Sequence, residues 1–138
     1  MPQLFNKSKI NFNSAKLLIE KGLDPPSVHC SYYSSFQLLK HVIAANEGIS
    51  YEELDIERDT LVKQQNKTIG AHEFLIDKKF LNLLSRERAN IRYAMELNQL
   101  KTYRRRADYD NIEITYNESK DALRLAQKIN EKLNEFLL

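Results

Sequence analysis

Helix breakers are scarce in this sequence, and their scarcity limits the folds open to it. Only 3 glycines and 3 prolines interrupt 138 residues, and β-branched residues do not gather into the short runs that favour strands. Hydrophobic residues make up 42% of the chain and charged residues 29%, a balance typical of a folded globular protein rather than a disordered one. We therefore expect one helical domain, residues 1–138, that is long enough to build its own core.

Apolar residues recur at helical spacing through most of the chain. The predicted helices span about 13–21, 25–46, 50–65, 71–84, 86–109 and 117–136. The expected fold is all-α, an up-and-down bundle of four main helices with one or two shorter extra helices.

Several helix ends carry local signals. Gly22 is a candidate stop for the first helix. Asp24 is a candidate N-cap for the second helix, and Ser50 with Glu53 matches a capping box for the third. The last helix is expected to bury these apolar residues: Ala122, Leu123, Ala126, Ile129, Leu133 and Leu137.

Several classes of protein are disfavoured by what the sequence lacks. Cys30 is the only cysteine, so an internal disulfide is impossible and a reducing compartment fits. No segment has the apolar length of a signal peptide or a membrane span, so we expect a cytoplasmic protein without a membrane partner. The three histidines, His29, His41 and His72, lack the spacing of a helical metal pair, and no glycine-rich phosphate loop occurs. We expect neither a metal nor a cofactor.

The predicted helix 86–109 breaks its own apolar pattern at Arg104. At about 100° per residue, Arg104 falls beside Leu97 and Leu100 on the packing face, where an unpaired guanidinium is costly. Asp108, one turn later, is the expected partner. The pair is either a functional site or a structural ion pair that fixes how the helix docks.

Basic residues concentrate on this helix. With a net charge of only +2, such clustering is the one feature that indicates nucleic acid. Arginine suits phosphate, and interleaved tyrosines can stack on bases. A solubilising face, balanced by Glu87 and Glu96, is the interpretation we favour for the cluster as a whole, but it does not explain Arg104. The basic residues are Arg86, Arg88, Arg92, Lys101, Arg104, Arg105 and Arg106.

Four segments, taken in chain order, resemble one known family. They are 15–18 (Ala-Lys-Leu-Leu), 31–36 (Ser-Tyr-Tyr-Ser-Ser-Phe), 70–72 (Gly-Ala-His) and 104–109 (Arg-Arg-Arg-Ala-Asp-Tyr). The chain resembles the HEPN domain (higher eukaryotes and prokaryotes nucleotide-binding), in the branch with a double tyrosine in its second helix and an Arg-x-x-Ala-Asp-Tyr motif. The resemblance implies a helical bundle that is commonly a homodimer. It also implies a nucleotidyltransferase or antitoxin protein as partner, in a toxin–antitoxin or phage-defence system.

Many members of that family are metal-independent endoribonucleases. The resemblance implies that an Arg-x(4–6)-His motif would place an arginine and a histidine at the scissile phosphate. In this chain Tyr109 stands where that histidine would follow Arg104. A tyrosine, with an ordinary pKa near 10, is a poor base at neutral pH.

We therefore predict a module that binds a nucleotide, RNA or a partner protein without the usual nuclease chemistry. The alternative is a divergent endoribonuclease toxin, in which Arg104 stabilises the phosphate and Tyr109 or Asp108 replaces histidine. A purely structural role for the Arg104–Asp108 pair is the third interpretation. The predicted ligand-binding residues are Arg104, Arg105, Arg106, Asp108, Tyr109 and Tyr33.

Overall fold

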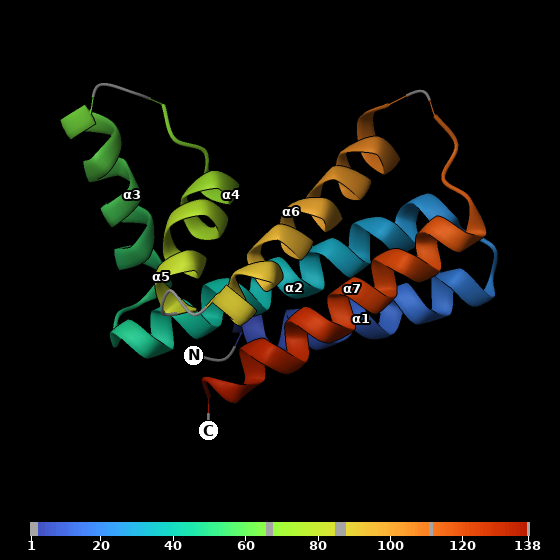
Figure 1. Cartoon of the computed structure of the whole chain (residues 1–138), viewed down its shortest axis with the longest axis horizontal. Coiled ribbons are helices and arrows are strands. Elements are labelled where there is room, and N and C mark those ends of the chain that lie inside the picture. Colours follow the sequence, from blue (N-terminus) through green and yellow to red (C-terminus); the bar gives the residue numbers. More distant parts are fainter. Residues whose placement is uncertain (1–2, 66–67, 85–87, 111, 138) are drawn as a thin grey trace.

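The computed structural model of the chain describes residues 3–65, 68–84, 88–110 and 112–137 (Figure 1). Within these ranges every regular element is a helix, which confirms the all-α prediction. In chain order the elements are α1 (Gln3–Glu20), α2 (Asp24–Glu47), α3 (Tyr51–Gln65), α4 (Ala71–Glu73), η1 (Phe74–Phe80), α5 (Leu81–Leu83), α6 (Arg88–Tyr109) and α7 (Tyr116–Glu135).

The long helices α1, α2, α6 and α7 pack together, and α2 contacts the other three (Figure 1). Burial of large apolar side chains between them supplies most of the stabilisation, at about 25 cal/mol per Å² of apolar surface. The largest buried side chains of α2, α6 and α7 include Tyr32, Leu39, Ile43, Leu97, Leu100, Ile129 and Leu133.

Helix α1 begins at Gln3, well before the predicted start near residue 13. Its early half packs partly buried Phe5 and Phe12 against the core, with polar side chains between them. Ser8 is buried, and its Oγ donates a hydrogen bond to the Ser34 carbonyl oxygen (2.5 Å). Asn11 Nδ2 donates to Gln37 Oε1 (2.8 Å). The predicted start was wrong because polar residues occupy inward positions between these two phenylalanines and so weaken the apolar periodicity.

The chain between α2 and α6 forms a further set of helices at one end of the molecule (green in Figure 1). Leu54 of α3 is buried in the common core. Lys79 of η1 connects this set to α2, because its Nζ forms ion pairs with Glu47 of α2 (3.0 Å) and Glu57 of α3 (2.5 Å).

The helical segment predicted over 71–84 contains a π-helical stretch, η1, that was not predicted from the sequence. Wider turns of this kind are rare and are frequently found near functional sites. Four of the seven residues of η1 are buried: Phe74, Leu75, Ile76 and Phe80. This burial fixes the preceding short helix α4 against the core.

Two of the predicted helix-end signals are confirmed. Gly22, two residues beyond the last residue of α1, has φ +75°, the left-handed conformation in which glycine commonly ends a helix. The Ser50–Glu53 capping box is present, with the Glu53 N–H donating to Ser50 Oγ (3.0 Å) and the Ser50 N–H to Glu53 Oε1 (3.5 Å).

The third signal, Asp24 as the N-cap of α2, was wrong by one residue. Leu23 is the N-cap of α2, and Asp24 is already its first helical residue. The Asp24 carboxylate accepts a hydrogen bond from Ser119 Oγ (2.9 Å) of α7. Asp24 therefore connects two helices instead of capping its own.

Helix α7 buries a slightly different set of residues from the predicted one. Leu125 is buried, whereas Leu123 and Leu137 are only partly so. Its start carries a capping box between Thr115 and Glu118 that was not predicted from the sequence.

The predicted start of helix 86–109 at residue 86 lies outside the described residues. None of the described helices combines the length and the apolarity needed to cross a bilayer.

Candidate functional site

Arg104 lies on the inward face of α6, as its place in the apolar stripe predicts. Its exposed fraction is 7%, and Leu97 and Leu100 on the same face are fully buried. The guanidinium is surrounded by aromatic rings, which attract a cation through their π faces. Arg104 Cζ lies within 6 Å of three ring centroids: Tyr32 (5.2 Å), Tyr33 (5.6 Å) and Tyr109 (5.5 Å).

The guanidinium of Arg104 is incompletely paired. Nη1 lies 3.6 Å from Asp108 Oδ2 and donates a long hydrogen bond to Tyr109 Oη (3.4 Å). The Nε atom is buried and has no hydrogen-bond partner among the described residues. The predicted Arg104–Asp108 pair is therefore present but loose, and a buried N–H without a partner destabilises the protein unless a ligand supplies one.

His72 of α4 joins the same cluster from a distant part of the chain. Its Nδ1 is hydrogen-bonded to the hydroxyl of the fully buried Tyr32. Its ring stacks on Phe36 (centroids 4.3 Å apart) and on Tyr32 (5.5 Å). The sequence indicated His72 only as part of the segment 70–72, without a role, because nothing local reveals a contact across 40 residues.

The surroundings of this pair alter both acid–base equilibria. Burial, and then the positive charges of Arg104 and Lys101, lower the pKa of His72 from 6.5 to about 4. Burial raises the pKa of the Tyr32 hydroxyl, a shift that Arg104 only partly offsets. At neutral pH the imidazole is therefore uncharged and the hydroxyl keeps its proton.

An open pocket of about 400 Å³ lies in front of Arg104, between α2, α4 and α6. Three of its lining residues are cations and one, Glu73, is an acid, so an anion is the ligand class that the pocket favours. The lining residues are Tyr33, Gly70, His72, Glu73, Lys101, Arg104, Arg105 and Tyr109.

Asp108 lies beside this pocket, in contact with α2. Its Oδ2 is 2.8 Å from Nδ1 of His29. An ionised carboxylate can only accept hydrogen bonds, so Nδ1 of His29 carries the proton. The His29 ring packs against Tyr33 with centroids 4.7 Å apart. His29 was absent from the predicted site, since it lies 79 residues from Asp108.

The structure brings five of the six predicted ligand-binding residues together and separates one. Arg106 points toward α7, where Nη1 forms an ion pair with Glu118 Oε2 (2.7 Å), and its Cζ lies 6.0 Å from the Tyr103 ring centroid. Tyr109, by contrast, stands at the pocket with an exposed fraction of 75%.

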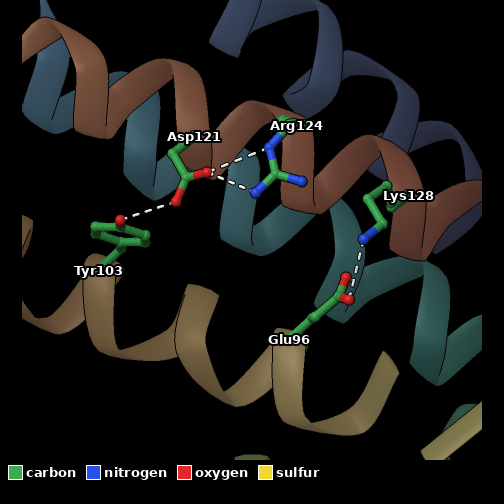
Figure 2. Close-up of polar contacts among 5 residues, drawn as sticks. All are labelled: Glu96, Tyr103, Asp121, Arg124 and Lys128. Atoms are coloured by element: carbon green, nitrogen blue, oxygen red, sulfur yellow. Dashed lines mark hydrogen bonds and ion pairs between the residues drawn. The ribbon is translucent and has the colours of Figure 1, made fainter. Parts of the chain in front are cut away.

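Other polar groups of α6 are engaged with α7 (Figure 2). Asp121 accepts hydrogen bonds from Tyr103 Oη (2.9 Å) and Arg124 Nη2 (2.7 Å). Lys128 Nζ donates to Glu96 Oε1 (3.0 Å). This side of α6 is balanced by its neighbour, so its charges do not indicate a ligand.

Among the described residues, no group of three or more His, Cys, Asp or Glu side chains is arranged to hold a metal ion. No family model, curated protein or solved structure matches the chain. Function is therefore inferred from the chemistry of the Arg104 pocket, because a fold alone does not determine function.

Proposed function

We propose that the Arg104 pocket binds the phosphate groups of a nucleotide or of RNA. The observation that carries this proposal is the buried Nε of Arg104, which has no partner among the described residues. Internal contacts engage Nη1, whereas Nε belongs to the side edge of the guanidinium, one of the edges that can hold an oxyanion with two parallel hydrogen bonds. An incoming phosphate would give the unpaired N–H the partner that it lacks.

The other lining residues suit the same ligand. Lys101 and Arg105 add positive charge at the pocket, which attracts a polyanion over a distance of about 10 Å at moderate salt. Tyr33 and the exposed Tyr109 offer ring faces beside the guanidinium. Bases stack on such rings with little sequence preference, so a nucleotide fits better than inorganic phosphate.

We also propose that α1, α2, α6 and α7 form an up-and-down four-helix bundle of the HEPN type. The support is the order of the four resembling segments and the packing of these helices around α2. On that basis we expect a homodimer that works with a nucleotidyltransferase or antitoxin protein in the cytoplasm. Analytical ultracentrifugation at micromolar concentration tests the dimer. A sample that sediments only as monomers would contradict it.

The binding proposal is tested with a short fluorescein-labelled single-stranded RNA, using fluorescence anisotropy. We expect binding that weakens steeply as salt rises, because released counterions drive it. Arg104→Ala should weaken it by at least about tenfold, the effect of losing a charge-assisted contact. Arg124→Ala removes the same charge on α7 and should change affinity by less than about twofold.

A matched pair at Gly70 avoids disturbing the core. Gly70 lines the pocket and is the N-cap of α4, and a Cβ added there meets nothing within 4 Å. Gly70→Asn and Gly70→Asp should both cap the helix, yet only the aspartate adds a negative charge. Gly70→Asp should weaken RNA binding about fivefold relative to Gly70→Asn. Equal affinities for the two variants would place the ligand elsewhere.

A divergent endoribonuclease is the second candidate function, and the position of His72 favours it. Nδ1 of His72 is engaged with Tyr32, which leaves Nε2 for a ligand. If Nδ1 donates to Tyr32, Nε2 has a free lone pair and can take the proton of a ribose 2′-hydroxyl. If the Tyr32 hydroxyl donates to Nδ1, Nε2 carries the proton. It can then donate a hydrogen bond to a ligand but cannot accept a proton from it. His72 therefore replaces Tyr109 as the candidate base.

Two measurements separate the candidates. The ¹⁵N chemical shifts of His72 identify the tautomer, and we expect the Nε2–H form of a binding site. Purified protein should then leave RNA intact at neutral and alkaline pH. RNA fragments ending in 2′,3′-cyclic phosphate, lost on His72→Gln, would establish the nuclease instead.

A further inference from the structure

The carboxylate of Asp108 contacts two side chains, His29 and Arg104, at unequal distances. Its Oδ2 lies 2.8 Å from His29 Nδ1 but 3.6 Å from Arg104 Nη1. Charge-assisted hydrogen bonds normally span about 2.7–2.9 Å. The close partner of Asp108 is therefore the histidine on α2, and not the arginine one turn away on its own helix.

This division is unexpected from local geometry. Residues at i and i+4 on a helix are neighbours, so Asp108 is the natural partner of Arg104. A tight contact between the two would neutralise the guanidinium and occupy N–H groups that an anion needs. In the observed arrangement Arg104 lines the pocket and keeps a buried Nε that has no partner among the described residues, and Asp108 lines the adjoining cavity of about 460 Å³ beside His29.

Other contacts fix the histidine and the carboxylate on the α2 side. His29 stands near the start of α2, where Pro25 and Pro26 open the helix, and its ring packs on Tyr33. The pKa of the neighbouring Cys30 thiol is raised by burial and then by the charge of Asp108, which is consistent with a carboxylate directed toward α2. The His29 side chain is 46% exposed, so it can be replaced without opening the core.

We propose that His29 is a positioning residue that draws Asp108 away from Arg104 and so keeps the guanidinium available to an anion. The inference rests on the proposed function, because the anion is the phosphate of that ligand. Without His29, the Asp108 carboxylate turns to Arg104 and competes with phosphate. His29 thus sets the affinity of a pocket whose lining does not include it.

The test is a double-mutant cycle, with the labelled RNA of the binding assay as probe. His29→Ala should weaken binding about tenfold, the cost of displacing a charge-assisted hydrogen bond. His29→Asn keeps an amide N–H at the position of Nδ1 and should restore most of the affinity. Asp108→Asn should bind at least as tightly as the wild type. The double variant His29→Ala/Asp108→Asn should match Asp108→Asn within about threefold.

Two outcomes of the cycle would overturn the inference. One is unchanged affinity in His29→Ala while Arg104→Ala loses binding, which leaves the proposed function standing. The other is a loss in His29→Ala that Asp108→Asn does not repair, since that is what a merely structural role produces.

A second measurement needs no ligand and decides the inference even if the RNA does not bind. The side-chain N–H groups of Arg104 exchange with water at rates that NMR can follow. In His29→Ala, capture by Asp108 should slow this exchange at least about threefold relative to the wild type. The double variant should return it to the wild-type rate. Equal exchange in wild type and His29→Ala would contradict the proposal.

Discussion

Acidification should destabilise this protein through His72, and the effect can be worked out from the site. In an unfolded chain the imidazole takes up a proton near pH 6.5, whereas in the folded protein its pKa is about 4. Between these values the unfolded state binds more protons, so the free energy of unfolding falls as the pH falls. The stabilising contribution is complete above about pH 6.5 and is lost by about pH 4.

The size of the effect follows from the difference between the pKa values of His72 in the unfolded and folded states. A difference between 6.5 and about 4 corresponds to roughly 3.4 kcal/mol at 1.36 kcal/mol per pH unit. His72 is only partly buried, so solvent screening reduces the expected loss to about 1–2 kcal/mol.

The assay is urea unfolding of the wild type and of His72→Gln at about pH 7.5 and about pH 4.5. Glutamine can still hydrogen-bond to Tyr32 but does not titrate in this range. The wild type should lose about 1–2 kcal/mol more than the variant on acidification. The carboxyl groups whose pKa values are lowered, Glu118 and Asp121, contribute equally to both proteins. An identical loss in the two proteins would refute the description of His72 as a partly buried imidazole that is uncharged at neutral pH.

Two helix ends give further predictions, both measured by urea unfolding. Thr115→Ala removes the hydroxyl that accepts the Glu118 N–H (3.1 Å) at the start of α7 and should lower the free energy of unfolding by about 1 kcal/mol; unchanged stability would mean that the capping box contributes nothing. Gly48→Ala forces an alanine into φ +69° and should also cost about 1 kcal/mol. Gly48→Asn is its control, because asparagine tolerates the left-handed conformation better than alanine, and equal losses in the two variants would contradict the strain argument.

Periodicity and spacing alone predicted those parts of the site that lie on one helix. Arg104 and its partner Asp108 are a single turn apart, so periodicity placed the arginine in the core and spacing identified the acid. Tyr33, Arg105 and Tyr109 were expected from the resemblance, and the pocket includes all three. Arg106 shows the limit of a motif, because its neighbours in the chain line the pocket while it pairs with Glu118.

The contributions of His72 and His29 could not be predicted in the same way. Each reaches the site from another helix, through contacts that span 40 and 79 residues respectively. A spacing rule searches for a histidine after the arginine in sequence, whereas the fold supplies His72 from before it. Helix α1 shows a related limit, because Ser8 and Asn11 interrupt the apolar stripe of its early half with contacts to α2 that only the fold reveals.

The most direct test of the central claim follows the Arg104 Nε–H by NMR while the single-stranded RNA is added. This group is buried and without a partner among the described residues, so a bound phosphate should give it a hydrogen bond. We predict a saturable downfield shift of its proton, with the same dissociation constant as the anisotropy assay, that is lost at high salt. An Nε–H signal that stays in place while the RNA binds elsewhere would show that Arg104 is a structural arginine and that the pocket is not the site.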